Sequence, residues 1–162
     1  MKSVLPLGTR LSVSQTLPGS SKKHLLNPDA TTGESLPWSS TAPSTLHLIF
    51  PQPTPATHLA LTFQGGFVGT SVNVWVAEES DSEAEGEVGL GLEYGGKLHP
   101  EDRNKRQVFE LPYPPSGILS SEAEPEDKSR QLPLLTELKL EFEQSSDHYN
   151  RVTLYSLEVL GQ

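Results

Sequence analysis

Apolar and polar residues alternate along much of the chain with the period of two that is typical of half-buried β-strands. Six segments follow this pattern, namely residues 45–50, 57–63, 71–77, 106–111, 138–143 and 152–160. In the first of them, Pro51 and Pro53 are expected to end the strand, because proline cannot donate to a sheet ladder. Residues 10–14 and 89–98 can supply two further strands.

The last of these strands contains a change of phase. Val152 and Leu154 fall on one face by strict alternation, whereas Leu157 and Val159 fall on the other. Either both faces are covered there, or a β-bulge near residues 155–156 shifts the pattern. Both interpretations bury the strand deeply, so we predict that Leu154, Leu157 and Val159 belong to the core.

The order of these elements indicates an all-β protein. No stretch keeps a helical period over three turns, and strands without intervening helices favour antiparallel sheets. The 14 prolines and 13 glycines lie largely between the strands, where turns are needed. A chain of 162 residues has the size of one domain and can bury a core without disulfides or a structural metal. We therefore predict a single domain over residues 1–162, an antiparallel jelly-roll β-sandwich of about eight strands.

Acidic residues are concentrated in two runs, so most of the net charge of −9 belongs to two short segments rather than to the whole chain. Ten acidic side chains lie within residues 78–87 and 122–127, and without them the net charge becomes +1. Such runs usually keep a loop solvated, so we expect loop insertions at about 78–98 and 116–130. Ser80 and Ser82 lie among these carboxylates, and their phosphorylation is a second hypothesis that phosphopeptide mapping tests.

Several classes of protein are disfavoured by what the sequence lacks. It has no cysteine, which excludes a disulfide framework and a zinc–thiolate site. The first residues hold too short an apolar run for a signal peptide, and no segment approaches the roughly 20 apolar residues of a membrane span. Short basic clusters at 22–23 and 103–106 lack interleaved aromatic residues. We therefore expect a protein of the cytoplasm or nucleus, not secreted, with no membrane and no nucleic acid as partner.

Catalytic motifs are also missing. The sequence has no His-Glu-x-x-His and no Gly-x-Ser-x-Gly, and Gly89-Leu90-Gly91 lacks the third glycine of a dinucleotide fingerprint. The five histidines are dispersed, and alternation places His47 and His58 on exposed faces. We expect no enzyme, no cofactor and no metal. A hydrolase would require two facing carboxylates in a cleft, which only a structure can reveal.

Four blocks of sequence carry a resemblance to a known family. They are residues 22–29 with Trp38-Ser39-Ser40 after them, Phe63-Gln64-Gly65-Gly66-Phe67, His99-Pro100-Glu101-Asp102, and residues 138–161, where an Asp147 loop precedes Arg151-Val152 and Tyr155-x-Leu-x-Val-Leu-Gly. Together they resemble the nuclear receptor 2C2-associated protein family of the discoidin, or galactose-binding-like, superfamily. Residues 41–55 and the acidic run after Trp75 depart from it. The resemblance implies a galactose-binding-like fold that associates with other proteins, such as an orphan nuclear receptor.

Loops at one end of such a sandwich provide the candidate contact surface. Its members are Trp38, Gln64, Gly65, Gly66, Phe67, Asp147 and Arg151. Each also has a structural interpretation: Trp38 as a packed aromatic, the two glycines as a turn with positive φ, and Arg151 as the ion-pair partner of Asp147. Phe67 is the best anchor, because an apolar ring beside a glycine turn is costly to leave in water.

These observations lead to one functional prediction and one alternative. We predict a non-enzymatic protein–protein interaction module, an adaptor or scaffold subunit of an intracellular, transcription-related complex. The alternative is a carbohydrate-binding module in which Trp38 stacks on a sugar and His24 hydrogen-bonds it. Asp29 either bonds its own loop, as Asx residues commonly do, or acts as a calcium ligand, as in some discoidin relatives.

Overall fold

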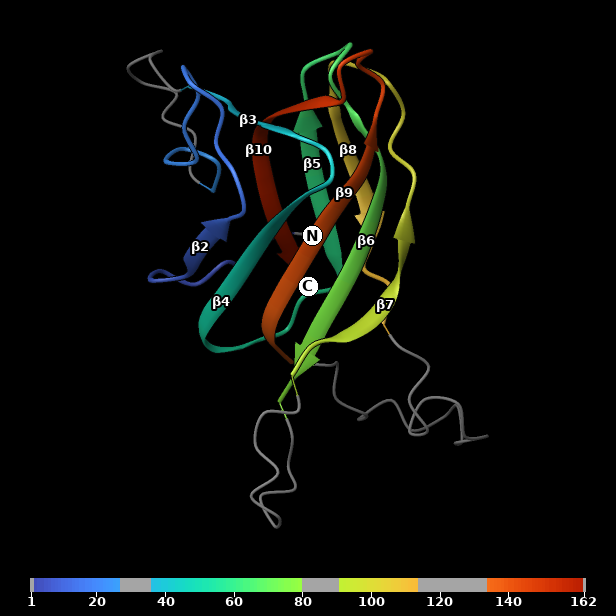
Figure 1. Cartoon of the computed structure of the whole chain (residues 1–162). Coiled ribbons are helices and arrows are strands. Elements are labelled where there is room, and N and C mark those ends of the chain that lie inside the picture. Colours follow the sequence, from blue (N-terminus) through green and yellow to red (C-terminus); the bar gives the residue numbers. More distant parts are fainter. Residues whose placement is uncertain (1, 27–35, 80–90, 114–133, 162) are drawn as a thin grey trace.

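Ten β-strands form in residues 2–26, 36–79, 91–113 and 134–161, the part of the chain that the computed structural model describes (Figure 1). They are β1 (Lys2–Ser3), β2 (Arg10–Val13), β3 (Trp38–Thr41), β4 (Ser44–Thr54), β5 (His58–Phe63), β6 (Gly69–Glu78), β7 (Glu93–Leu98), β8 (Arg106–Glu110), β9 (Leu135–Ser145) and β10 (Arg151–Gly161). No helix occurs in the described ranges, and none there is long and apolar enough to cross a membrane.

The strands build two antiparallel sheets packed face to face. One sheet has the order β1-β10-β5-β8, and the other has the order β2-β4-β9-β6-β7. Strand β3 also belongs to the first sheet and pairs with the first residues of β10, whereas β1 pairs with its last residues. Consecutive strands often lie in opposite sheets, as a jelly roll requires. This arrangement confirms the predicted all-β sandwich. Strand β3 escapes prediction because its inward position Ser40 is a polar residue, so apolar alternation cannot reveal it.

The core lies between the sheets and consists of the inward faces that alternation identified. Each sheet contributes side chains with almost no exposed surface, among them Leu46, Leu48, Val72, Val74, Val76, Leu138, Leu140 and Phe142 from one sheet and Leu59, Leu61, Phe63, Leu154, Leu157 and Val159 from the other. Three aromatic rings meet in the core near one end of the sandwich, where Phe142 packs against Trp38 and Phe63. Burial of this apolar surface is the main stabilising contribution to the fold.

Of the two interpretations of the last strand, the bulge near residues 155–156 is the one that the register confirms. In the pairing of β10 with β5, Leu154 lies opposite Phe63 and Ser156 opposite Thr62, so Tyr155 is the extra residue. Tyr155 points outward and is exposed, while Leu154, Leu157 and Val159 are all buried. The extra residue resets the phase, which lets β10 present apolar side chains to the core along its whole length.

Two predicted boundaries are wrong. Strand β4 continues past Pro51 to Thr54, but its register with β9 is interrupted between Ile49 and Thr54. The prolines therefore lie where the ladder is already irregular, a position that tolerates a missing N–H. The loop insertion expected at about 78–98 is too long, because β6 extends to Glu78 and β7 occupies Glu93–Leu98, within the range 89–98 where a strand was also expected.

Several expectations fall on residues outside the described ranges. They concern Asp29, Ser80 and Ser82, the central part of the first acidic run and the insertion at 116–130.

A network of polar side chains covers the outer face of the second sheet. Ser71 Oγ donates to Glu143 Oε1 at 2.8 Å, and Lys97 Nζ lies 3.0 Å from the same oxygen. The Ser71 hydrogen bond is the largest cause that lowers the pKa of Glu143 to about 2, and Lys97 and Asn73 contribute in the same direction. His47 on this sheet and His58 in β5 of the other sheet were expected to be exposed and inert, but both are half-buried. His47 pairs with Glu137 at 2.8 Å. The face is therefore a set of specific contacts rather than a uniformly solvated surface.

The low pKa of Glu143 predicts a loss of stability in acid. Its folded-state pKa of about 2 lies below the ordinary value of 4.5, so its ionised form stabilises the fold above pH 4.5, and this contribution falls as the pH drops toward 2. We expect the stability gap between the wild type and Glu143→Gln to shrink between about pH 6 and about pH 3. Urea unfolding at both pH values measures this. If the difference in stability between the wild type and Glu143→Gln is the same at both pH values, the low pKa of Glu143 is contradicted.

Candidate contact surface at the loop end

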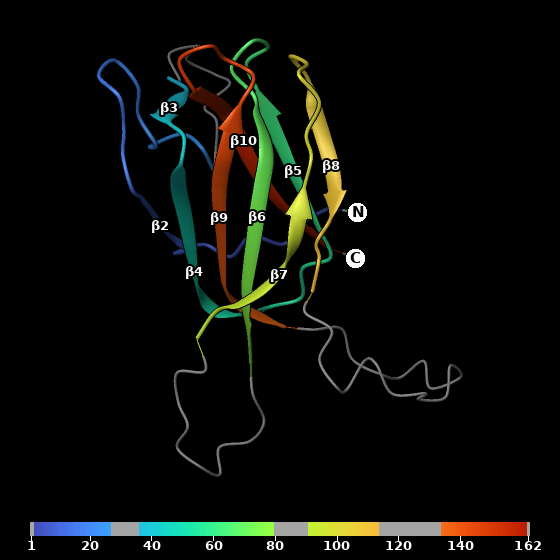
Figure 2. The same cartoon turned by 45° about the vertical axis from the view of Figure 1, so that its right-hand side comes forward.

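Four loops meet at one end of the sandwich, drawn at the top of Figures 1 and 2. They are residues 42–43, 64–68, 99–105 and 146–150. Backbone hydrogen bonds join them: Ala42 N donates to Asn150 O at 2.7 Å, and Ser146 N donates to Val68 O at 2.9 Å. The Phe63-Gln64-Gly65-Gly66-Phe67 block and the Asp147 loop, far apart in sequence, therefore share this end.

The Gly65-Gly66 turn is held by the loop between β7 and β8. Gly65 N donates to Asn104 Oδ1 and Gly66 N donates to Asp102 Oδ1, both at 2.8 Å. Gly66 has φ of +91°, as predicted, whereas Gly65 is not in the left-handed region. At Gly65 the need for glycine is one of space, because an added Cβ would lie 3.2 Å from the Cβ of Asn104. Asp102 lies in a block that the sequence singled out, but its partner in the turn was not foreseen.

Asp147 organises the loop between β9 and β10. Its Oδ2 accepts hydrogen bonds from Tyr149 N at 3.2 Å, from Arg151 N at 3.1 Å and from Arg151 Nε at 2.9 Å. The predicted Asp147–Arg151 pair is confirmed, and its side-chain hydrogen bond is the main cause of the lowered pKa of Asp147. Asn150 has φ of +63°, a conformation that asparagine tolerates well. The tip of the loop is thus fixed by one carboxylate oxygen.

Aromatic rings flank the guanidinium of Arg151. Its Cζ lies 5.0 Å from the ring centroid of Phe67 and 5.6 Å from that of Tyr149, within the range of cation–π attraction. Tyr149 is 70% exposed, and His148 contacts it edge to face with centroids 5.2 Å apart. We call the group of Phe67, Asp147, His148, Tyr149 and Arg151 the loop-end surface.

Sequence reasoning placed Phe67, Asp147 and Arg151 in this surface but missed Tyr149. The available signal was an aromatic residue in an otherwise polar turn, directly before an asparagine.

Trp38 is the clear correction among the candidate residues. It has no exposed surface, its ring packs against Phe142 with centroids 5.9 Å apart, and its Nε1 donates to Gln15 O at 2.9 Å. The ring closes the core beneath the loops, so it can neither touch a partner nor stack on a sugar. The interpretation of Trp38 as a packed aromatic is therefore confirmed, and the sugar site in which Trp38 stacks beside His24 is wrong. Gln64 is half-buried, and its backbone N donates to Thr153 O at 2.9 Å, which ties the loop to β10.

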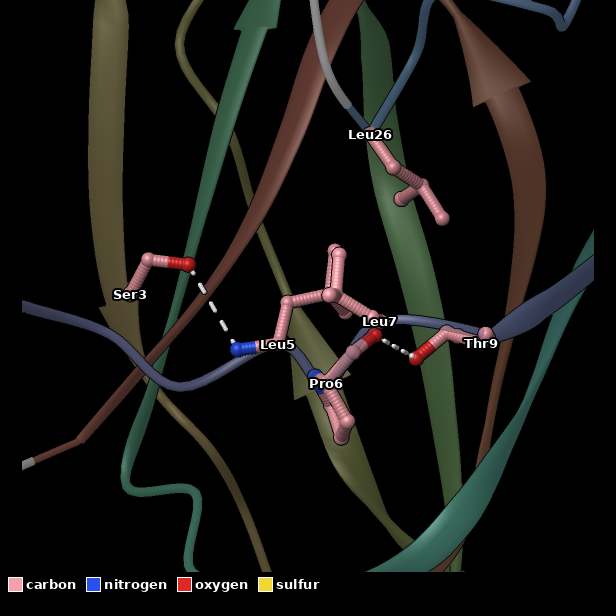
Figure 3. Close-up of a pocket in the computed structure, with 7 residues that line it drawn as sticks. Ser3, Leu5, Pro6, Leu7, Thr9 and Leu26 are labelled. Carbon is pink, nitrogen blue, oxygen red and sulfur yellow. Dashed lines mark hydrogen bonds between the residues drawn. The ribbon is translucent and has the colours of Figure 1, made fainter.

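A hollow of about 350 Å³ lies elsewhere, along the connection from β1 to β2 (Figure 3). Its lining consists of Ser3, Leu5, Pro6, Leu7, Gly8, Thr9 and Leu26. Both hydroxyl groups form hydrogen bonds with the backbone of their own segment: Thr9 Oγ1 donates to Pro6 O at 2.8 Å, and Ser3 Oγ accepts from Leu5 N. The hollow has no carboxylate, and no three metal-ligating side chains gather anywhere in the described ranges. It lacks the convergent polar groups that would orient a ligand.

Comparison with known proteins identifies the family. A Bos taurus protein named nuclear receptor 2C2-associated protein is 32% identical over 146 residues, covering 87% of this chain and 79% of that protein. The chain belongs to the nuclear receptor 2C2-associated protein family. A Danio rerio protein of the same name is 31% identical over 115 residues, covering 71% of this chain and 62% of that protein's length. No family model matches the sequence.

Solved structures agree with the fold. An F5/8 type C domain from Bacteroides fragilis superposes with a TM-score of 0.63 at 10% identity and covers 94% of this chain and 90% of that domain. A chitosan-binding module from Paenibacillus sp. IK-5 superposes with a TM-score of 0.62, also at 10% identity, over 99% of this chain and all of that module. At such low identity the likeness establishes the architecture alone, a discoidin-type, galactose-binding-like sandwich.

Proposed function

We propose that this chain is a non-enzymatic adaptor or scaffold subunit that binds a protein partner through the loop-end surface, in a complex of the cytoplasm or nucleus. The observation that carries the proposal is the gathering of Phe67, Tyr149 and Arg151 at one end of the sandwich, with Tyr149 70% exposed. Aromatic and arginine side chains are the residues most enriched among the energetic anchors of protein interfaces.

The rigidity of this end also supports a binding role. The two loops that supply the rings are joined by a backbone hydrogen bond from Ser146 to Val68 and by one from Val68 N to Ser146 Oγ at 3.0 Å. The glycine turn is fixed by Asp102 and Asn104. A surface that is already ordered loses less conformational entropy when a partner binds. The core sandwich then acts as a scaffold that presents preformed loops.

The identity of the partner is taken from the relatives. Their name states an association with nuclear receptor 2C2. One of the structural neighbours is named as a chitosan-binding module. For this chain, nuclear receptor 2C2 or a complex that contains it is the first partner to test. The described hollow, which lacks a carboxylate, offers no support for a hydrolytic role.

A pair of double variants tests the proposal. We expect Phe67→Ala/Tyr149→Ala to weaken binding to purified nuclear receptor 2C2, and to lower recovery of partners in quantitative affinity capture, by about tenfold or more. The matched control is Val108→Ala/Tyr155→Ala, which removes exposed apolar groups from β8 and β10. Thermal unfolding of both variants verifies that each is folded. Equal recovery with the two variants would refute the loop end as the contact surface.

Carbohydrate binding is the second candidate, because the fold neighbours include a chitosan-binding module. With Trp38 buried, a sugar bound at the loop end would stack on Phe67 or Tyr149. A glycan array probed with the folded chain tests this directly. Binding that disappears in Tyr149→Ala would favour the carbohydrate role, and the absence of any bound glycan would count heavily against it.

A further inference from the structure

We infer that Arg151 binds a carboxylate of the protein partner, so that the partner presents an aspartate or glutamate side chain to the loop-end surface beside an apolar group. This inference rests on the proposed function and specifies the chemistry of its partner. It is carried by three features of Arg151: which of its N–H groups are already used, how the guanidinium is held, and what surrounds it.

The guanidinium has hydrogen-bonding capacity to spare. Arginine carries five N–H donors in a planar fork. The Nε–H group donates to Asp147 Oδ2 at 2.9 Å, and the terminal amino groups have no acceptor within the described part of the chain. The side chain is 46% exposed, so this end of the fork is accessible. Two parallel N–H groups match the two oxygens of a carboxylate, the geometry in which arginine binds it best.

Asp147 does not need the arginine side chain to shape its loop. Its Oδ2 already accepts the backbone N–H groups of Tyr149 and Arg151, which are the bonds that close the turn. The additional contact with Nε holds the guanidinium from one side and engages only one of its five N–H groups. This arrangement is a positioned donor rather than an ion pair with both partners fully engaged.

The two rings complete the site. Phe67 and Tyr149 lie 5.0 Å and 5.6 Å from Cζ of Arg151, which restricts the rotamers of the long side chain before any partner arrives. They also provide apolar contact area beside an incoming carboxylate. An acidic side chain next to an aliphatic or aromatic residue would satisfy both parts of the surface. A neutral polar group would provide neither the negative charge for Arg151 nor more than part of the contact that this surface offers.

The net charge of −9 does not oppose this inference at short range. Charges separated by more than about 8 Å are largely screened at physiological ionic strength, whereas a bidentate contact is made at hydrogen-bond distance. Because Asp147 neutralises Arg151, the site attracts an anion by the geometry of its donors and not by a long-range positive field. We therefore expect a singly charged carboxylate to be preferred over a more highly charged phosphate, which the carboxylate of Asp147 would repel more strongly.

Two small probes that differ only in the acidic group test the inference. Phenylacetate and phenylacetamide are titrated separately into the isotopically labelled full chain and followed by NMR. We expect phenylacetate to shift the side-chain Nε–H signal of Arg151 and the amide signals of Gly66 and Tyr149 in a saturable manner, with phenylacetamide at least about tenfold weaker. Equal binding of the two probes, or preferential binding of inorganic phosphate, would overturn the assignment to a carboxylate.

Variants locate the effect. Arg151→Lys keeps the charge but lacks the planar fork, and we expect it to lose about tenfold in phenylacetate affinity. The matched control is Arg106→Lys, since Arg106 is paired through two N–H groups with Glu158 on a sheet face. Unchanged affinity in Arg151→Lys would refute the site, and wild-type selectivity between the probes tests it without any variant.

The outcome is separable from that of the proposed function. If partner binding requires Phe67 and Tyr149 while the two probes bind equally, the contact surface stands and the carboxylate inference fails.

Discussion

Replacing Phe142 with alanine is expected to lower the free energy of unfolding by about 3–5 kcal/mol. The ring has no exposed surface and lies between the sheets, with centroids 5.9 Å from Trp38 and 6.1 Å from Phe63. It also fills the space beside Gly69, where an added Cβ would lie 2.8 Å from the Phe142 ring. Because its neighbours belong to both sheets and pair with other strands, they cannot collapse into the cavity that alanine leaves.

Urea unfolding followed by tryptophan fluorescence measures this change. The matched control is Phe142→Leu, which keeps most of the apolar volume and is expected to cost less than about 1.5 kcal/mol. If Phe142→Ala lowers the free energy of unfolding by less than about 1.5 kcal/mol, this part of the core repacks easily. That result would contradict the tight packing of the aromatic cluster.

Gly95→Ala is expected to destabilise the sandwich by about 3 kcal/mol or more, at the upper end of the range for overpacking. Gly95 is the extra residue of a bulge, because Trp75 of β6 lies opposite Tyr94 and Val74 lies opposite Gly96. A Cβ at Gly95 would lie 2.2 Å from the carbonyl oxygen of Pro112. Backbone atoms cannot rotate away as a side chain can, so either β7 or the segment after β8 must move.

Hydrogen exchange of β7 and urea unfolding together measure the result. We expect the amides of Glu93–Leu98 to lose protection first, since β7 is an edge strand. Gly65→Ala is a matched control, because its new Cβ would lie 3.2 Å from the Cβ of Asn104 and 3.4 Å from the backbone N of Asn104, a tight contact rather than an overlap. Its effect should stay within about 1 kcal/mol. If Gly95→Ala and Gly65→Ala lower the free energy of unfolding equally, the clash with the backbone of Pro112 is not the cause of the destabilisation.

Alternation predicted the core well because it reports directly which side of a strand faces the other sheet. Leu46, Leu48 and Phe50 are buried as expected, and the change of phase in β10 correctly indicated a bulge. The same signal is silent where a buried position is polar, as at Ser40, which bonds Ser44 inside the protein. It also could not show that β4 resumes its pairing after Pro53, because a strand can continue through an irregular stretch of ladder.

The candidate site was predicted less completely than the core. Local patterns indicated a positive φ at Gly66 and a pair between Asp147 and Arg151, since both depend on residues close in sequence. The contact between Arg151 and Phe67 depends on the packing of two distant loops, and no local pattern encodes it. Trp38 was assigned to the surface because a motif identifies a residue without stating which way its side chain points.

The pairing of Lys2 with Gly161 places the two chain ends side by side, at one pole of the molecule, and the loop-end surface forms the other pole. Strand β10 runs for 11 residues from Arg151 to Gly161, a length of roughly 35 Å, so the paired chain ends lie far from the loop-end surface. Anything joined to either end, whether a solid support, a fluorescent label or further polypeptide, leaves the opposite pole unobstructed. The protein can therefore be tethered at one pole while the other remains open to a second molecule, which is the geometry that a bridging subunit needs.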